Sequence, residues 1–371
     1  MTTTHTELSL ERLAGLARAG ITLIGGLQAE SGAYPASPTF PVYRFSWLRD
    51  GAFIADAMSR SGNHESADRF FAWCDRVLRD RATRIGELLT DRSAGRTIPV
   101  DRFLPCRFTL DGADDDSEWW NFQLDGYGTW LWALGAHVER TGASVAPYAE
   151  GVRLTVDYLE AFWGEPCFDW WEEHGDHRHT STLAAIAGGL AAVASLPGVD
   201  PDVTARAAAT ADAARSACLE QRSGGVLLKW EGSDSVDASL VACATPFRLL
   251  DPGDPIMRAT VARIEERLVR GGVYRYEDDT YYGGGEWILL AGLLGWHYAE
   301  TGRTDAAWAL LRWMAAQARG DELPEQSSAQ LLAPGREQEW IGRWGPSACP
   351  LLWSHAMFVT LALELGVLEA S

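Results

Sequence analysis

Apolar residues recur at helical spacing along most of the 371-residue chain, and this periodicity predicts an all-α protein. Short polar joints around Gly62, Gly142 and Gly302 separate successive apolar segments. Glycine after the last turn accepts the left-handed conformation that ends a helix, and a short joint makes neighbouring helices antiparallel. Helices are predicted over residues 7–31, 49–62, 63–81, 121–142, 146–163, 179–196, 200–222, 236–248, 254–270, 284–302, 303–319 and 350–367.

Long irregular segments interrupt the helical pattern and decide between two architectures. Helical hairpins that repeat along a chain form either an open solenoid or a closed ring. Segments rich in Gly, Pro, Asp, Arg and Trp recur between alternate hairpins, whereas solenoid joints are short. They cover residues 87–120, 164–178, 223–235, 271–283 and 320–349. We therefore expect a closed ring of about six hairpins, formed by residues 1–371 as one domain without an interdomain linker.

The composition limits which classes of binding partner and which cellular location we expect for the protein. The formal net charge of −19 disfavours nucleic acid and anionic membrane surfaces. No apolar run reaches membrane-spanning length, and the N-terminus lacks the basic and apolar stretches of a secretory signal, so we expect a cytoplasmic protein. The six cysteines are scattered without a CxxC pair, which disfavours a zinc ribbon or a redox motif. Most of the 17 tryptophans fill the core, but some in loops beside carboxylates suit the apolar faces of sugar rings.

Two polar clusters suit the recognition and cleavage of a sugar. Arg49 and Asp50 offer a donor fork beside a bidentate acceptor, which matches adjacent hydroxyls on a hexose. Their alternative role is structural, with Asp50 as a helix N-cap and Arg49 in a surface salt bridge. The segment Asp169-Trp170-Trp171-Glu172-Glu173-His174-Gly175 places two carboxylates beside indoles. Apolar cover and a like charge raise a carboxyl pKa, as a general acid requires, although a solvated acidic loop has the same pattern.

The remaining candidates are less specific. His174, His177 and His179 form an H-x-x-H-x-H pattern, but no distant Cys or His cluster completes a metal site, so we expect no metal. Glycines 283–285 lack the Lys-Ser/Thr of a phosphate-binding loop, and we interpret them as a bend that lets backbone approach a ligand. Glu325 lies in a loop between helices, where a single glutamate does not by itself indicate a site. It becomes a candidate catalytic residue only in combination with the other clusters.

Taken together, these segments resemble glycoside hydrolase family 15, the glucoamylase family, in order along nearly the whole chain. The motifs are Tyr43-x-x-x-Trp47-x-Arg49-Asp50, Trp119-x-x-x-Gln123-x-Asp125-Gly126, Asp169-x-Trp171-Glu172-Glu173, Arg275-Tyr276-x-x-Asp279-Thr280-Tyr281-Tyr282-x-Gly284-x-x-Trp287, and Glu325-Gln326 followed by Leu352-Trp353-Ser354-His355-Ala356. Each motif is moderately specific, and five in order are strong support. The resemblance implies an (α/α) barrel with a pocket at one end and inverting hydrolysis of a terminal α-glucosyl residue without a cofactor.

The resemblance also assigns roles to individual residues. Glu172 would be the general acid and Glu325 the general base, with Tyr43 against the base and the attacking water. Glu173 is a competing acid, and only the motif match ranks the two. The residues implied to bind substrate are Trp47, Arg49, Asp50, Trp119, Trp171, Glu173, Arg275, Tyr276, Asp279 and Trp287. Inversion requires the two catalytic carboxyl groups to stand about 6.5–9.5 Å apart, which leaves room for the water.

Departures from the family pattern bear on the substrate. Bacterial members of the family usually carry an N-terminal β-sandwich, whereas we expect neither this domain nor a starch-binding module here, and Glu286 replaces a proline common beside the tryptophan of the fourth motif. A short α-gluco-oligosaccharide is therefore expected, with α-1,6 links as in isomaltose favoured over α-1,4. The alternatives are an α,α-trehalase of the same family and a non-catalytic helical-repeat protein that binds glycans or proteins. The oligomeric state stays open.

Overall fold

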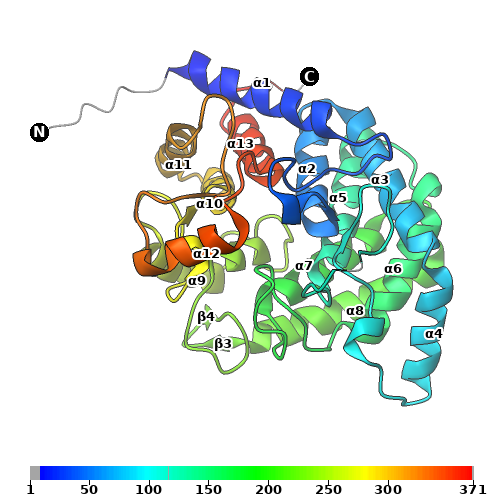
Figure 1. Ribbon diagram of the computed structural model, residues 1–371. Coiled ribbons are helices and arrows are strands. Elements are labelled where there is room, and N and C mark those ends of the chain that lie inside the picture. The colour runs from blue at the N-terminus through cyan, green and yellow to red at the C-terminus, as the bar shows by residue number, and fades with distance from the viewer. Residues whose placement is uncertain (1–8, 116, 370–371) are drawn as a thin grey trace, which may run out of the picture.

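The helices form two concentric layers in the computed structural model, which describes residues 9–115 and 117–369 (Figure 1). The elements of the inner layer pack side by side in a closed ring. They are α2 (Leu48–Arg60), α5 (Asp125–Thr141), α7 (Thr180–Ser195), the 3₁₀ helix η4 (Ala238–Cys243), α10 (Ile288–Glu300) and α13 (Leu352–Glu364). The outer layer is α1 (Leu10–Leu27), α3 (His64–Arg79), α6 (Ala149–Phe162), α8 (Pro201–Glu220), α9 (Pro255–Leu268) and α11 (Thr304–Ala316). The fold is therefore the expected barrel of six helical hairpins.

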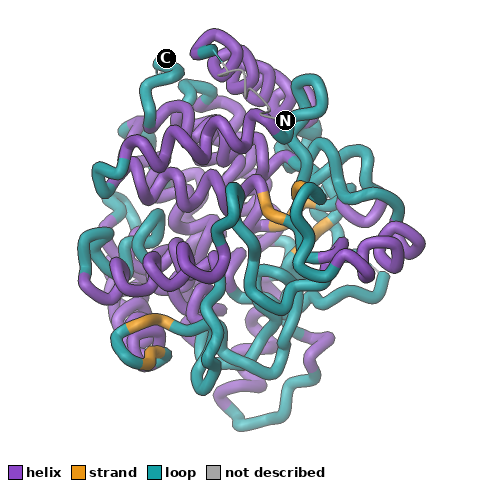
Figure 2. The backbone as a smooth tube through the Cα atoms, turned by 90° about the vertical axis from the view of Figure 1, so that its left-hand side faces the viewer, coloured by secondary structure: helices purple, strands orange, loops and turns teal. Residues whose placement is uncertain are grey.

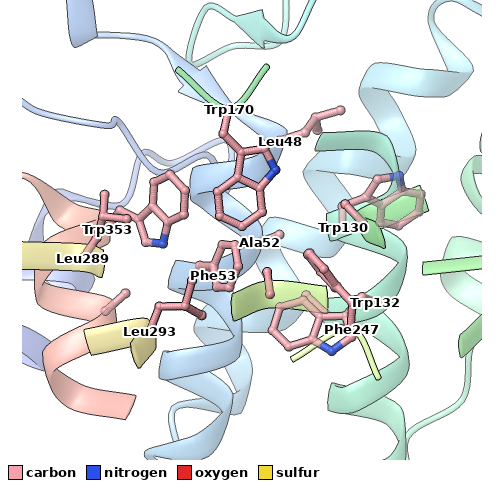
Figure 3. Packing of buried hydrophobic residues seen from close by; sticks show 14 of the residues in the cluster. Leu48, Ala52, Phe53, Trp130, Trp132, Trp170, Phe247, Leu289, Leu293 and Trp353 are labelled. Atoms are coloured by element: carbon pink, nitrogen blue, oxygen red, sulfur yellow. The ribbon is translucent and has the colours of Figure 1, made fainter. Parts of the chain in front are cut away.

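The pattern of apolar residues explains which helices lie inside. Residues 288–298 of α10 are all buried, as an inner helix covered on every side requires. The outer helix α8 buries a single stripe that includes Val203, Ala207, Ala211 and Ala214, at spacings of three and four residues. Aromatic side chains fill the barrel axis, where Phe53 stacks on Trp353 with ring centroids 5.1 Å apart (Figure 3).

Glycines let two inner helices approach closely. A Cβ atom on Gly189 of α7 would lie 2.0 Å from the carbonyl oxygen of Gly128 in α5, which no side chain tolerates. Gly128 in turn faces the carbonyl of Ala185, 2.3 Å from where its own Cβ would be. The α5–α7 contact is therefore a backbone contact, and it draws the ring closed on this side.

Three predicted elements differ from the structure. Residues 236–248 form only the short η4, because Asp237 caps its start and Pro246 lacks the amide hydrogen that a continuing helix needs. Two helices lie in segments expected to be loops, α4 (Ala82–Ser93) at the edge of 87–120 and α12 (Glu337–Trp344) within 320–349. Neither shows a strong apolar stripe, since α4 buries only two residues and α12 buries none.

The loops that enter the inner helices gather at one end of the barrel (Figure 2). Short antiparallel pairs join them. In each pair, neighbouring loops or two arms of one loop are linked: β1 (Ser46–Trp47) with β2 (Arg107–Phe108), β3 (Arg222–Ser223) with β4 (Val226–Leu227), and β5 (Glu286–Trp287) with β6 (Gln326–Ser327). Within the described part of the chain, no helix is long and apolar enough to cross a membrane. The single-domain prediction includes residues 1–8, 116, 370 and 371, which lie outside the described residues, and it stays a prediction.

Candidate active site

A cavity of about 810 Å³, its open mouth included, lies at the end of the barrel where the inner helices begin. Of the thirteen site residues predicted from the sequence, all except Tyr276 and Asp279 line it. The lining residues are Ala36, Tyr43, Trp47, Arg49, Asp50, Trp119, Trp120, Trp170, Trp171, Glu172, Glu173, Arg275, Tyr281, Trp287, Leu289, Glu325, Trp340, Trp344, Leu351 and Trp353. The wall of this single cavity thus combines carboxylates, arginines and indole rings.

Glu325 occupies one wall of the cavity and is almost completely buried, with 1% of its surface exposed. Its Oε1 accepts a hydrogen bond from the Tyr43 hydroxyl (2.9 Å), and its Oε2 accepts one from the Ser347 hydroxyl (2.9 Å). Burial raises the pKa of this carboxyl from 4.5 to about 7, although the two hydroxyl donors and Arg275 oppose the rise. This carboxyl group therefore ionises near neutral pH.

Glu172 occupies another part of the wall and has a different environment. Its Oε1 accepts hydrogen bonds from the indole N–H groups of Trp47 (2.8 Å) and Trp119 (3.0 Å) and from the amide of Gln123 (3.1 Å). Three donors on one oxygen leave no room for a proton there. A proton on this carboxyl group must therefore sit on Oε2, and that oxygen is the one able to donate it.

A tight turn holds Glu172 in place. Its backbone has φ = 66°, a left-handed conformation that is uncommon for a residue with a side chain. Asp169 locks this turn, because its Oδ1 accepts hydrogen bonds from the backbone N–H groups of Trp171 and Glu173, both at 2.9 Å. The N–H of Glu172 donates to the carbonyl of Asp169 (3.0 Å). The direction of the Glu172 side chain is thus set by the side chain of Asp169.

Arg49 and Asp50 form a buried clamp at the start of α2. The Arg49 guanidinium donates to Gln123 (2.9 Å) and to Asp125 (3.0 Å), and it lies 3.4 Å from Asp50. Burial raises the pKa of Asp50 to about 7, and Arg49 limits the rise. The structural alternative is wrong on both counts, because Arg49 is buried and the N-cap position belongs to Trp47.

A second arginine is oriented in the same way on the opposite loop. Arg275 donates through Nε (2.7 Å) and through a second nitrogen to the carboxylate of Asp279, and it approaches Glu173 at 3.4 Å. The Tyr276 hydroxyl also donates to Glu173. Tyr276 and Asp279 therefore stand behind the cavity wall and orient Arg275 and Glu173, which themselves face the cavity.

Comparisons with known proteins agree with this geometry. Residues 12–332 match the family described as Glycosyl hydrolases family 15. Over 97% of its length the chain is 48% identical to an isomaltose glucohydrolase from Kribbella flavida, and the match covers 94% of that protein. The chain belongs to glycoside hydrolase family 15. It is therefore a glycoside hydrolase, a class of enzyme whose substrates are small carbohydrates or glycans, and the non-catalytic alternative loses its support.

Solved structures place this family 15 enzyme among glycosidases. A glycosidase variant solved in complex with glucose has 46% sequence identity and a TM-score of 0.95, and the match covers both chains completely. A bacterial glucoamylase complexed with acarbose has a TM-score of 0.75 at 18% identity, over 96% of this chain and 56% of that one. The second likeness concerns the fold alone, and it agrees with the barrel described above.

Several residues of the family 15 enzyme's cavity were not singled out from the sequence. Tyr281 belongs to the fourth of the five motifs, and its hydroxyl lies 2.8 Å from that of Tyr43. Trp340 and Trp344, four residues apart on α12, form part of the cavity wall, and Trp344 stacks on Trp119 with centroids 6.2 Å apart. Their spacing of four residues is a helical signal, but the helix has no buried stripe to reveal it.

Two other expectations for the enzyme concern residues near the site. The rings of His174, His177 and His179 pack around the indole of Trp230, and His177 stacks on it at 4.5 Å. No group of three or more His, Cys, Asp or Glu side chains in residues 9–115 and 117–369 is arranged to hold a metal ion. Glu286 is buried, and its carboxylate accepts a hydrogen bond from the backbone N–H of Gly272 (2.7 Å), which links two parts of the loop before α10. The side chain does not line the cavity.

Proposed function

We propose that this enzyme is an inverting exo-α-glucosidase that releases β-glucose from the non-reducing end of short α-1,6-linked gluco-oligosaccharides such as isomaltose. The observation that carries the proposal is that Glu172 and Glu325 line one cavity in different hydrogen-bonding environments. The name and the 48% identity of the Kribbella relative support isomaltose as the substrate.

The proposed chemistry divides the work between the two carboxyl groups. Glu172 donates the proton on its Oε2 to the glycosidic oxygen, so that the bond between C1 and the leaving sugar breaks. Glu325 removes a proton from a water that attacks C1 from the opposite face, and β-glucose forms. The Tyr43 hydroxyl donates to Glu325 Oε1, which supports the ionised base and fixes its orientation. No cofactor enters this mechanism.

The shape and charge of the cavity suit a terminal sugar. Trp170 and Trp353 line the cavity on the side of the aromatic core that fills the barrel (Figure 3), so the inner end is closed. A closed inner end admits the end of a chain and not its middle. Arg49, Asp50 and Arg275 would hold the hydroxyls of this sugar, because their donors and acceptors are fixed in advance by buried partners.

The test compares products and substrates directly. Proton NMR of the first minutes of isomaltose hydrolysis is expected to show β-glucose, and α-glucose would exclude inversion. Glu172→Gln and Glu325→Gln are each expected to lose at least a hundredfold in turnover, as general acid and base residues do, while circular dichroism shows an intact fold. Rates on isomaltose, maltose, α,α-trehalose and starch decide the linkage, and a higher rate on trehalose would support the trehalase alternative.

A further inference from the structure

Lys229 is the only lysine in the chain, whereas every other member of its 32 Lys and Arg residues is an arginine. It lies in the loop between α8 and η4, behind the wall that carries Glu172, and its side chain is 4% exposed. The ammonium group does not line the cavity. A buried charge is costly unless it is paired, so its surroundings should explain why it is there.

Three side chains surround the ammonium group of Lys229. Its Nζ lies 3.2 Å from Asp169 Oδ2 and 3.1 Å from Asp237 Oδ2, and it stands 3.7 Å from the centre of the Tyr276 ring. These partners belong to three different loops, 163–179, 221–237 and 269–287. The two carboxylates keep the pKa of Lys229 above its usual value despite burial, so the group is charged.

Each of these three partners holds one or both of the residues that flank Glu172 in its turn, Trp171 and Glu173. Asp169 accepts the N–H groups of Trp171 and Glu173, Asp237 accepts the indole N–H of Trp171 (2.8 Å), and Tyr276 donates to Glu173. Without the ammonium, Asp169 and Asp237 would face each other as unpaired buried carboxylates. Their mutual repulsion would push one of them away, and the turn that sets Glu172 at φ = 66° would lose its lock.

We infer that Lys229 is a positioning residue for the general acid, and that it acts through the Asp169 and Asp237 carboxylates. This inference rests on the proposed role of Glu172. A compact ammonium with three donors fits between two carboxylates and a phenol ring, whereas a guanidinium is a larger planar fork. This difference explains why the position holds lysine in a chain that otherwise uses arginine.

The test uses two substrates that differ in their need for an acid. Isomaltose requires protonation of its leaving oxygen, whereas α-glucosyl fluoride releases fluoride with little help from an acid, and both need Glu325 to deprotonate the water. Lys229→Met is expected to lose about a hundredfold in kcat/KM on isomaltose, the scale of a displaced catalytic group, and less than about tenfold on the fluoride. Equal losses on both substrates would overturn the inference.

A charge-balanced variant provides the rescue. In Lys229→Met/Asp169→Asn the side-chain oxygen of residue 169 still accepts the two backbone N–H groups, and its new amide donates toward Asp237. Part of the lost isomaltose activity should return, and no recovery would contradict the mechanism. If Lys229→Met does not fold, the same comparison is made with Lys229→Arg, because the larger cation should displace the turn. Parental rates on both substrates in Lys229→Arg would refute the requirement for an ammonium group.

Two controls separate this inference from the proposed function. Arg206→Met removes a cation on the outer helix α8 that binds Asp157 and Glu160 of the outer helix α6. This change should leave the ratio of the two substrate rates unchanged. Glu172→Gln should show the largest separation of the two rates. If Glu172→Gln shows no separation, the acid assignment fails; if it does and folded Lys229→Met does not, only the inference about Lys229 fails.

Discussion

Replacing the proposed base should stabilise the protein in a pH-dependent way. The pKa of Glu325 rises from 4.5 to about 7 on folding, and this difference corresponds to about 3 kcal/mol of destabilisation when the carboxyl is ionised. Because the folded pKa is the higher one, the folded state is favoured while the group holds its proton. That advantage is complete below pH 4.5 and is lost as the pH rises through about 7.

Glu325→Gln removes the ionisation and can keep both contacts, because its amide oxygen accepts from the Tyr43 hydroxyl and its NH₂ group donates to the Ser347 hydroxyl oxygen. The free energy of unfolding of this variant should match that of the parent near pH 4 and exceed it by up to about 3 kcal/mol at pH 8. Urea denaturation at the two pH values measures the difference. Glu30→Gln, at an exposed position, is the control and should show no such pH dependence. An equal stability difference at both pH values, or a less stable variant at pH 8, would refute the electrostatic reasoning.

Three further predictions concern the cavity. Ser347→Ala removes a hydrogen-bond donor that lowers the pKa of Glu325. The rising limb of the plot of kcat/KM against pH should therefore move from about pH 7 to higher pH, and the loss of activity should be larger at pH 6 than at pH 8. Trp344→Ala removes part of the aromatic wall beside Trp119 and should raise the rate on isomaltotriose relative to isomaltose, whereas Trp308→Ala on α11 should not change this ratio. Arg275→Lys keeps the charge but loses the two-point contact with Asp279, so the inhibition constant for glucose should rise roughly tenfold or more.

The helical periodicity of the sequence was sufficient to predict most of the barrel. An inner helix such as α10 is apolar on all sides, and an outer helix such as α8 has one apolar stripe, so both leave a signal. The signal fails where tertiary structure decides. Residues 236–248 have helix-forming composition but are stopped by Pro246, and α12 is held by aromatic contacts of residues that are not buried enough to form a stripe.

The site was predictable as far as its residues lie in family motifs. The motifs identified Glu172 and Glu325, but not the contacts that distinguish them. Gln123 reaches Glu172 from 49 positions away, and Ser347 reaches Glu325 across α12. Lys229 carried a signal in the sequence as the sole lysine, but only its burial between two aspartates gives that signal a meaning.

The direction of the inner helices gives a physical reason for the position of the carboxylates. The cavity lies at their N-terminal ends, where the helix dipole is positive and favours negative side chains. Asp50 and Asp125 stand in the first turns of α2 and α5, whereas Arg60 and Arg140 stand in the last turns of the same helices. With the helices reversed, the negative ends would face the cavity and add to the cost of burying each carboxylate. The existing direction opposes that cost, and it acts in the same sense as the Ser347 and Tyr43 hydroxyls and Arg275, which limit the rise in the pKa of Glu325.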